Sequence, residues 1–142
     1  MSTTFTYRDL ETWKQAMDLV EKCYRTTPSL PTSELYGLTS QLRRAAVSIP
    51  SNVAEGHCRR STKAYANHVS IALGSHGELA TCIDLCARLG FMKQLEATRL
   101  LASSNSVGRL LNGLYRSLEA KLLQESDRSG GPNNPQPLTS NL

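Results

Sequence analysis

The sequence has no long apolar run, and we expect no secretory leader. Its 142 residues contain no stretch of about 18 uninterrupted apolar residues, the length that a membrane-spanning helix needs. The first residues, from Met1 to Phe5, lack the basic and apolar segments of a signal peptide. We therefore expect a cytoplasmic protein with no membrane partner.

Aromatic residues are also few, at one Trp, five Tyr and two Phe, although 39% of the chain is hydrophobic. The core must therefore consist mainly of Leu, Ala, Val and Ile, which suit interdigitating helices better than a sheet. A chain of this length can bury one core without disulfides or metal ions.

The motifs of common enzyme classes are missing. The chain has no Gly-rich phosphate loop, no HExxH pair and no paired acidic cluster for a divalent metal. His57 lies beside Cys58, but no nearby acid completes a nucleophile, base and orienting group. His68 has no such partner in the sequence, and His76 falls in an apolar stripe, as a hydrogen-bonded core histidine does. We expect no catalytic residues and no cofactor.

The four cysteines do not form a metal site by their spacing. Cys82 and Cys86 lie one helical turn apart, which is half of a possible site. Cys23, Cys58 and the histidines supply no second pair at a recognisable spacing. We interpret the cysteines as reduced structural thiols and expect no metal.

Apolar periodicity predicts four helices, over about 9–26, 33–56, 61–89 and 94–124. Short connections favour an all-α, up-down-up-down, left-handed four-helix bundle over residues 1–126. Residues 127–142, rich in Gly, Pro, Asn and Ser, predict a disordered tail. Each predicted helix has one apolar stripe that we expect to face the core. In chain order, the four stripes consist of Leu10, Trp13, Met17, Val20 and Tyr24; of Leu35, Leu38, Leu42, Ala45, Ile49 and Val53; of Tyr65, Val69, Ala72, His76, Leu79, Ile83 and Cys86; and of Ala97, Leu100, Val107, Leu111, Leu114 and Leu118.

Several residues predict local features of these helices. Asp9 is placed to cap the first helix and Gly56 to end the second. Pro50, inside the second helix, predicts a kink near residues 46–50. The small residues Ala66, Ser70, Gly74 and Gly77 form a line on which another helix backbone can approach closely.

The net charge of +4 is local. Residues 35–77 hold five basic residues and one acid, Glu55, whereas the rest of the chain holds eleven residues of each sign. A basic patch on a neutral background is typical of nucleic-acid binding, although such a patch can also be a solvated face. We predict a nucleic-acid-binding role for the five basic residues Arg43, Arg44, Arg59, Arg60 and Lys63.

The second helix also carries a polar stripe at helical spacing. Ser48, Asn52 and their neighbours are mediocre helix formers, so the sequence departs here from local preference. Such a departure indicates either a ligand site or a crowded contact between helices or subunits. The stripe comprises Gln41, Arg44, Ser48, Asn52, Glu55 and Arg59.

The run from Leu38 to Gly56, LTSQLRRAAVSIPSNVAEG, resembles the signature of four-helix bundle proteins encoded within intervening sequences of bacterial 23S ribosomal RNA genes. Further matches lie at Asp9-Leu10 with Trp13, at Pro31 with Glu34–Leu38, and at Ala72–Ser75 with Glu78-Leu79. The resemblance covers about residues 5–123. The sequence departs from the family pattern at His57-Cys58, where an aromatic or aliphatic start to the loop is expected.

The resemblance implies a protomer that assembles into a homopentamer, and a similarity to accessory proteins of diversity-generating retroelements, which engage nucleic acid and a reverse transcriptase. It also implies signature or interface roles for seven residues: Gln41, Ser48, Pro50, Asn52, Glu55, Gly56 and Gly74. The leading hypothesis is a non-catalytic, homo-oligomeric nucleic-acid-binding protein that prefers RNA. The alternative is an adaptor ring that binds a protein partner, such as a polymerase, without touching nucleic acid.

Overall fold

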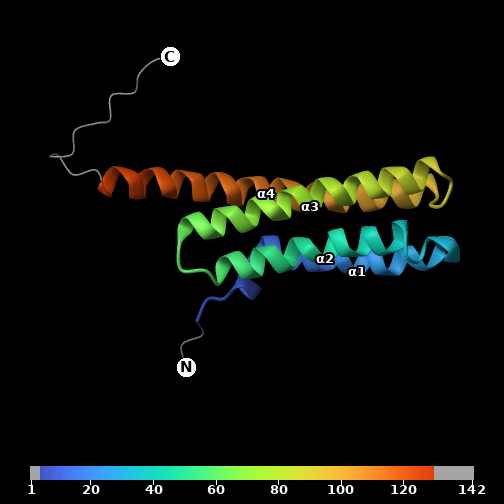
Figure 1. Cartoon of the computed structure of the whole chain (residues 1–142), viewed down its shortest axis with the longest axis horizontal. Helices are drawn as coiled ribbons and strands as arrows, with labels where there is room; N and C mark the ends of the chain where they lie inside the picture. The colour runs from blue at the N-terminus through green and yellow to red at the C-terminus, as the bar shows by residue number, and fades with distance from the viewer. Residues whose placement is uncertain (1–3, 130–142) are drawn as a thin grey trace, which may run out of the picture.

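The computed structural model describes residues 4–129, which form four long helices and three short 3-10 turns (Figure 1). The long helices are α1 (Glu11–Thr26), α2 (Leu38–His57), α3 (Thr62–Arg88) and α4 (Gln94–Ser129). The turns are η1 (Tyr7–Asp9), η2 (Thr27–Ser29) and η3 (Thr32–Glu34). Within this range there is no strand, and none of the helices combines the length and apolar character needed to cross a membrane.

The helices pack in the order in which they follow one another. Contacts join α1 to α2, α2 to α3, α3 to α4, and α4 back to α1. This arrangement confirms the predicted up-down-up-down bundle. It also places the α2–α3 groove and the α1–α4 groove on opposite sides of the molecule.

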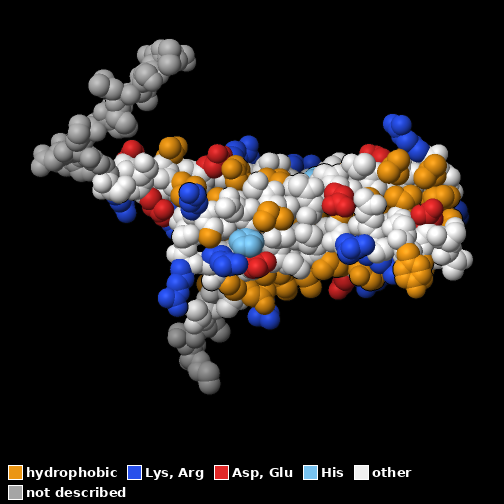
Figure 2. All heavy atoms as spheres, viewed as in Figure 1, with side chains coloured by type: hydrophobic (Ala, Val, Ile, Leu, Met, Phe, Trp, Pro, Cys, Tyr) orange, Lys and Arg blue, Asp and Glu red, His pale blue; other side chains and the backbone are white. Residues whose placement is uncertain are grey.

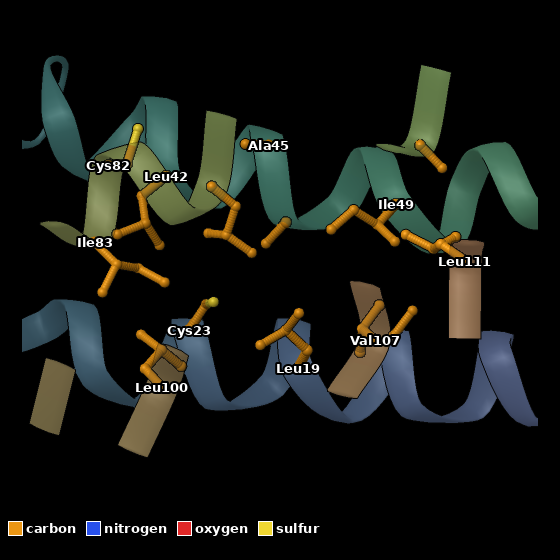
Figure 3. Packing of buried hydrophobic residues seen from close by; sticks show 14 of the residues in the cluster. Leu19, Cys23, Leu42, Ala45, Ile49, Cys82, Ile83, Leu100, Val107 and Leu111 are labelled. Carbon is orange, nitrogen blue, oxygen red and sulfur yellow. The ribbon is translucent and has the colours of Figure 1, made fainter. Parts of the chain in front are cut away.

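The core is built from aliphatic side chains and thiols, as Figure 3 shows. The predicted stripes of α2, α3 and α4 supply most of it, including Leu42, Ile49, Leu79 and Leu111, all fully buried. Leu35 is an exception because it lies in the turn before α2 and is exposed. Three of the four cysteines, Cys23, Cys82 and Cys86, are buried in the same core.

The predicted core stripe of α1 is wrong, because the helix turns a different line of residues toward the core. The buried residues are Thr12, Ala16, Leu19 and Cys23. Met17 and Tyr24 are exposed, while Leu10, Trp13 and Val20 are only partly buried. Both sets recur at three- and four-residue steps. The smaller set faces the core because small side chains let α1 pack close to its neighbours.

The ends of the helices also differ from the expected ones. Asp9 does not cap α1; its carboxylate accepts a hydrogen bond from the Thr6 amide (2.8 Å) within η1. Glu34 lies before α2 rather than in its first turn, and its carboxylate accepts a hydrogen bond from the Leu38 amide (3.1 Å). α4 extends to Ser129, so the first residues of the predicted tail are helical. The remainder, residues 130–142, lies outside the described residues.

α2 continues through Pro50 to His57, so Gly56 does not end it. Gly56 is needed for a different reason, because a β-carbon there would lie 2.7 Å from the His68 β-carbon. The predicted line of close approach on α3 is wrong within this chain. Apart from the adjoining backbone of α3 itself, nothing lies within 4 Å of where a β-carbon would stand on Gly74 or Gly77, so no other helix approaches them.

The buried thiols give a test of the core. Burial raises the pKa of Cys23 to about 12 and also raises the pKa values of Cys82 and Cys86. Because the thiolate is the reactive form, these thiols are protected by both access and protonation. At pH 8 we expect one of the four thiols, the exposed Cys58, to react rapidly with Ellman's reagent, and the other three only after denaturation. Cys58→Ser should abolish the fast phase; a persisting fast phase would contradict the packing.

Candidate functional site

The polar stripe of α2 lies against α3 and forms a chain of hydrogen bonds with it. The Ser48 and Ser75 hydroxyls are 2.7 Å apart, and the Asn52 amide donates to the Ser48 hydroxyl (3.0 Å) and carbonyl (2.8 Å). Asn52 Oδ1 is 3.1 Å from Nδ1 of His68. Of the two interpretations of this stripe, its centre therefore matches the crowded contact between helices.

The ends of the stripe remain open to solvent. At one end, Gln41 donates a long hydrogen bond (3.5 Å) to Glu78. Gln41, Arg44, Ser48, Ser75 and Glu78 line a shallow polar groove of about 360 Å³, together with Tyr36, Gly37 and Ala45. At the other end, Glu55 pairs with Arg59 (3.5 Å) and lies 3.9 Å from His68.

Three predicted basic residues lie together at the α2–α3 loop. Arg59, Arg60 and Lys63 are all exposed within five positions of one another. Figure 2 shows basic side chains around the end of the bundle where Figure 1 places this loop. Two acids reach the same end, Glu55 and Glu125, and the Glu125 carboxylate accepts a hydrogen bond from Thr62 (2.7 Å). The local charge is therefore positive but small.

Arg43 and Arg44 are adjacent in sequence but serve different surfaces. The Arg43 guanidinium lies 4.6 Å from the centre of the Tyr24 ring, and its Nε donates to Thr27 (2.9 Å). Arg43 is therefore tied to the end of α1. Arg44 is exposed beside the polar groove, in the second turn of α2, whereas Arg59 lies beyond the opposite end of that helix. The five basic residues thus form one loop cluster, one isolated groove residue and one packed residue.

Histidines pack rather than stand free. His76 Nε2 donates to the Ser104 carbonyl (2.8 Å), and its ring occupies the space left by Gly108, where a β-carbon would lie 2.7 Å away. This confirms the prediction of a hydrogen-bonded core histidine. The His57 ring packs edge-on against Tyr65, at 5.7 Å between centroids, and lies 5.8 Å from Phe5.

The sequence pattern does not predict the α3 partners of the stripe. Ser75 and His68 lie seven residues apart, so they fall on one helix face, and this spacing was available as a signal. A search for apolar residues that face the core passes over Ser75 and His68 because both are polar. Pro50, the remaining signature residue, is buried and faces α1 in an apolar groove that also contains Trp13, Met17 and Val47.

Comparison with known proteins identifies a family and a solved structure of similar fold. A family model described as 23S rRNA-intervening sequence protein matches residues 8–113. A crystal structure of a protein with unknown function from the S23 ribosomal protein family of Bacteroides thetaiotaomicron is similar, with a TM-score of 0.68. It is 18% identical, over 73% of this chain and 97% of that chain, so it shows the fold alone. No curated protein matches the chain.

The approach of α2 to α3 gives a test of this site. Ala in place of Gly56 would put its β-carbon 2.9 Å from the Tyr65 ring and 2.7 Å from the His68 β-carbon, neither of which is a flexible end. We expect Gly56→Ala to lower the free energy of unfolding by about 1–3 kcal/mol, measured by urea denaturation.

The matched control is Gly113→Ala, in α4, where no atom lies within 4 Å of the new β-carbon. That variant should raise stability by up to about 1 kcal/mol through helix propensity. Equal effects of the two substitutions would contradict the close approach at Gly56.

Proposed function

This chain belongs to the 23S rRNA-intervening sequence protein family, and we propose that it is a non-catalytic homo-oligomer that binds nucleic acid, with RNA preferred. The observation that carries the proposal is the exposed cluster of Arg59, Arg60 and Lys63 at the α2–α3 loop. The ion pair between Arg59 and Glu55 is more than half exposed, so it holds Arg59 only weakly. These cations can therefore turn to phosphates.

The surface reads backbone charge rather than sequence. Arg44 adds a fourth exposed cation on the same side of the bundle, whereas Arg43 is engaged with Tyr24 and Thr27. Four phosphate contacts on a single strand correspond to a slope of log K against log salt of about −2.8 per protomer. A slope of that size describes weak binding for one protomer. The preference for RNA is motivated by the family description alone.

Self-association would multiply this small patch. The apolar groove between α1 and α2 supports it, since Met17 and Val47 are each nearly 40% exposed there beside Trp13 and Pro50. Figure 2 shows hydrophobic side chains gathered along this edge of the bundle. Exposed Gly74 and Gly77 on α3 offer a second surface for close approach between copies. A pentamer is the stoichiometry that the family resemblance implies.

A protein-binding adaptor ring is the second candidate. Its support is a set of exposed hydrophobic residues at the end of the bundle opposite the α2–α3 loop (Figure 1). Tyr36 is 92% exposed there, and a protein partner would bury such residues, whereas nucleic acid would not need them. The others are Leu35, Leu85, Leu89 and Leu95.

Charge reversal tests the nucleic-acid surface. We expect Arg44→Glu with Arg59→Glu to abolish binding of a fluorescent single-stranded RNA, measured by anisotropy at low salt, with an unchanged helical circular dichroism spectrum. The control is Lys93→Glu with Arg109→Glu, an equal charge change at exposed positions on the α4 side. Equal loss in both variants would mean that net charge, not this surface, drives binding. Loss of the fold in the first variant would mean that its side chains are structural.

Self-association has a separate test. Val47→Glu places a carboxylate in the α1–α2 groove without touching the core, and we expect light scattering to show a shift from a mass near five protomers to one. Leu123→Glu, at another exposed hydrophobic position, should leave the mass unchanged. A wild-type monomer would contradict the oligomer, and an unchanged Val47→Glu mass would exclude this groove as the contact.

A further inference from the structure

A basic pocket lies between α1 and α4, on the side of the bundle opposite the α2–α3 groove. The last turns of α1, the η2 turn and the first turns of α4 enclose about 490 Å³. Three basic residues line it: Lys22 and Arg25 from α1, and Arg99 from α4. None of them belongs to the surface of the proposed function.

The donors of this pocket are partly positioned already. Lys22 Nζ donates to the Ser103 hydroxyl across the two helices (3.0 Å), which leaves the hydroxyl hydrogen of Ser103 for another acceptor. Arg25 has one acidic neighbour, Glu21, at 3.7 Å, in an exposed pair that holds it weakly. Arg99 is exposed at the opposite wall.

The floor of the pocket is apolar. Leu100 lies beneath it and is only 3% exposed, and the methylene stems of the three cationic side chains extend its apolar surface. A bare anion would use the charges but would leave the methylene stems of these side chains in contact with water. The pocket volume falls in the range of about 300–1,000 Å³ that is typical of sites for small organic ligands.

The charge and shape of the pocket together indicate the chemical class of its ligand. Three cations, the lining carboxylate of Glu96 and the carboxylate of Glu21 beside Arg25 give the pocket and its rim a net charge of +1. A phosphate monoester carries about −1.5 to −2 at pH 7. Arginine binds phosphate through two parallel N–H groups and also stacks on flat rings.

We propose that this pocket binds a nucleoside monophosphate, with the phosphate between Lys22, Arg99 and Ser103 and the base over Leu100. The same chemistry is offered by a free mononucleotide and by the 5′-phosphorylated end of a strand. The pocket stands on α1 and α4 residues, so the proposal is independent of binding through the α2–α3 loop.

Calorimetry on the full chain tests the pocket, with AMP, adenosine and inorganic phosphate as probes. We expect AMP to bind and to displace a fluorescent AMP analogue, with adenosine and phosphate at least about tenfold weaker. Binding of adenosine or phosphate as tight as that of AMP would overturn the proposal. A 5′-phosphorylated RNA trinucleotide compared with its 5′-hydroxyl form distinguishes the strand end from the free nucleotide, and binding of neither AMP nor the phosphorylated trinucleotide also overturns it.

Substitutions locate the binding. We expect Arg99→Gln and Lys22→Gln each to weaken AMP about tenfold, the loss of one charge-assisted hydrogen bond, while Lys93→Gln, outside the pocket, has no effect. Unchanged affinity in both pocket variants would overturn the assignment. Should either variant not fold, the other and the displacement series on the wild type still decide. The Arg44→Glu, Arg59→Glu protein should bind AMP normally, which separates this site from the loop surface.

Discussion

At the end of α2, Gly56 faces His68 and Tyr65 so closely that no β-carbon fits between the two helices. Hydrogen bonds between Ser48 and Ser75 and between His68 Nδ1 and Asn52 Oδ1 continue this contact along the pair. These hydrogen bonds are directional, so they define the rotation of α2 about its own axis more strictly than apolar packing alone would. The rest follows from that rotation: Arg44 faces the polar groove, Arg43 faces Tyr24, and Pro50 faces α1.

The stripes of α2, α3 and α4 could be predicted from the sequence because each contains one dominant apolar line. In α1 two lines of residues share the same helical spacing, and the prediction placed the line with the larger side chains in the core. Thr12, Ala16, Leu19 and Cys23 are buried instead, and the smaller side chains of this set suit a closer approach of neighbouring helices. Helix spacing is a property of the assembled bundle, so the pattern of α1 alone did not contain it.

The candidate sites show a similar division. The sequence identified the basic residues near the α2–α3 loop because a single acid, Glu55, accompanies the five cations of residues 35–77. It missed the α1–α4 pocket because Lys22, Arg25 and Arg99 are interspersed with acids along the chain, and a regional charge count cancels. Only the fold brings these three cations, from two helices far apart in the sequence, to one pocket. Likewise, nothing in the sequence distinguishes Arg43 from Arg44 except about 100° of helix rotation.

The contacts between α2 and α3 are nested around the loop that joins them. Asn52 with His68 spans 16 residues, Ser48 with Ser75 spans 27, and Gln41 with Glu78 spans 37. Each pair therefore closes a chain segment only modestly longer than the one closed by the pair inside it. Once the inner pair has formed, the next pair costs only a little additional loop-closure entropy. The helical hairpin can zip from its loop outward, each hydrogen bond aligning the next. A shift of either helix by one turn would separate all three pairs, so the polar stripe favours a single register of α2 against α3.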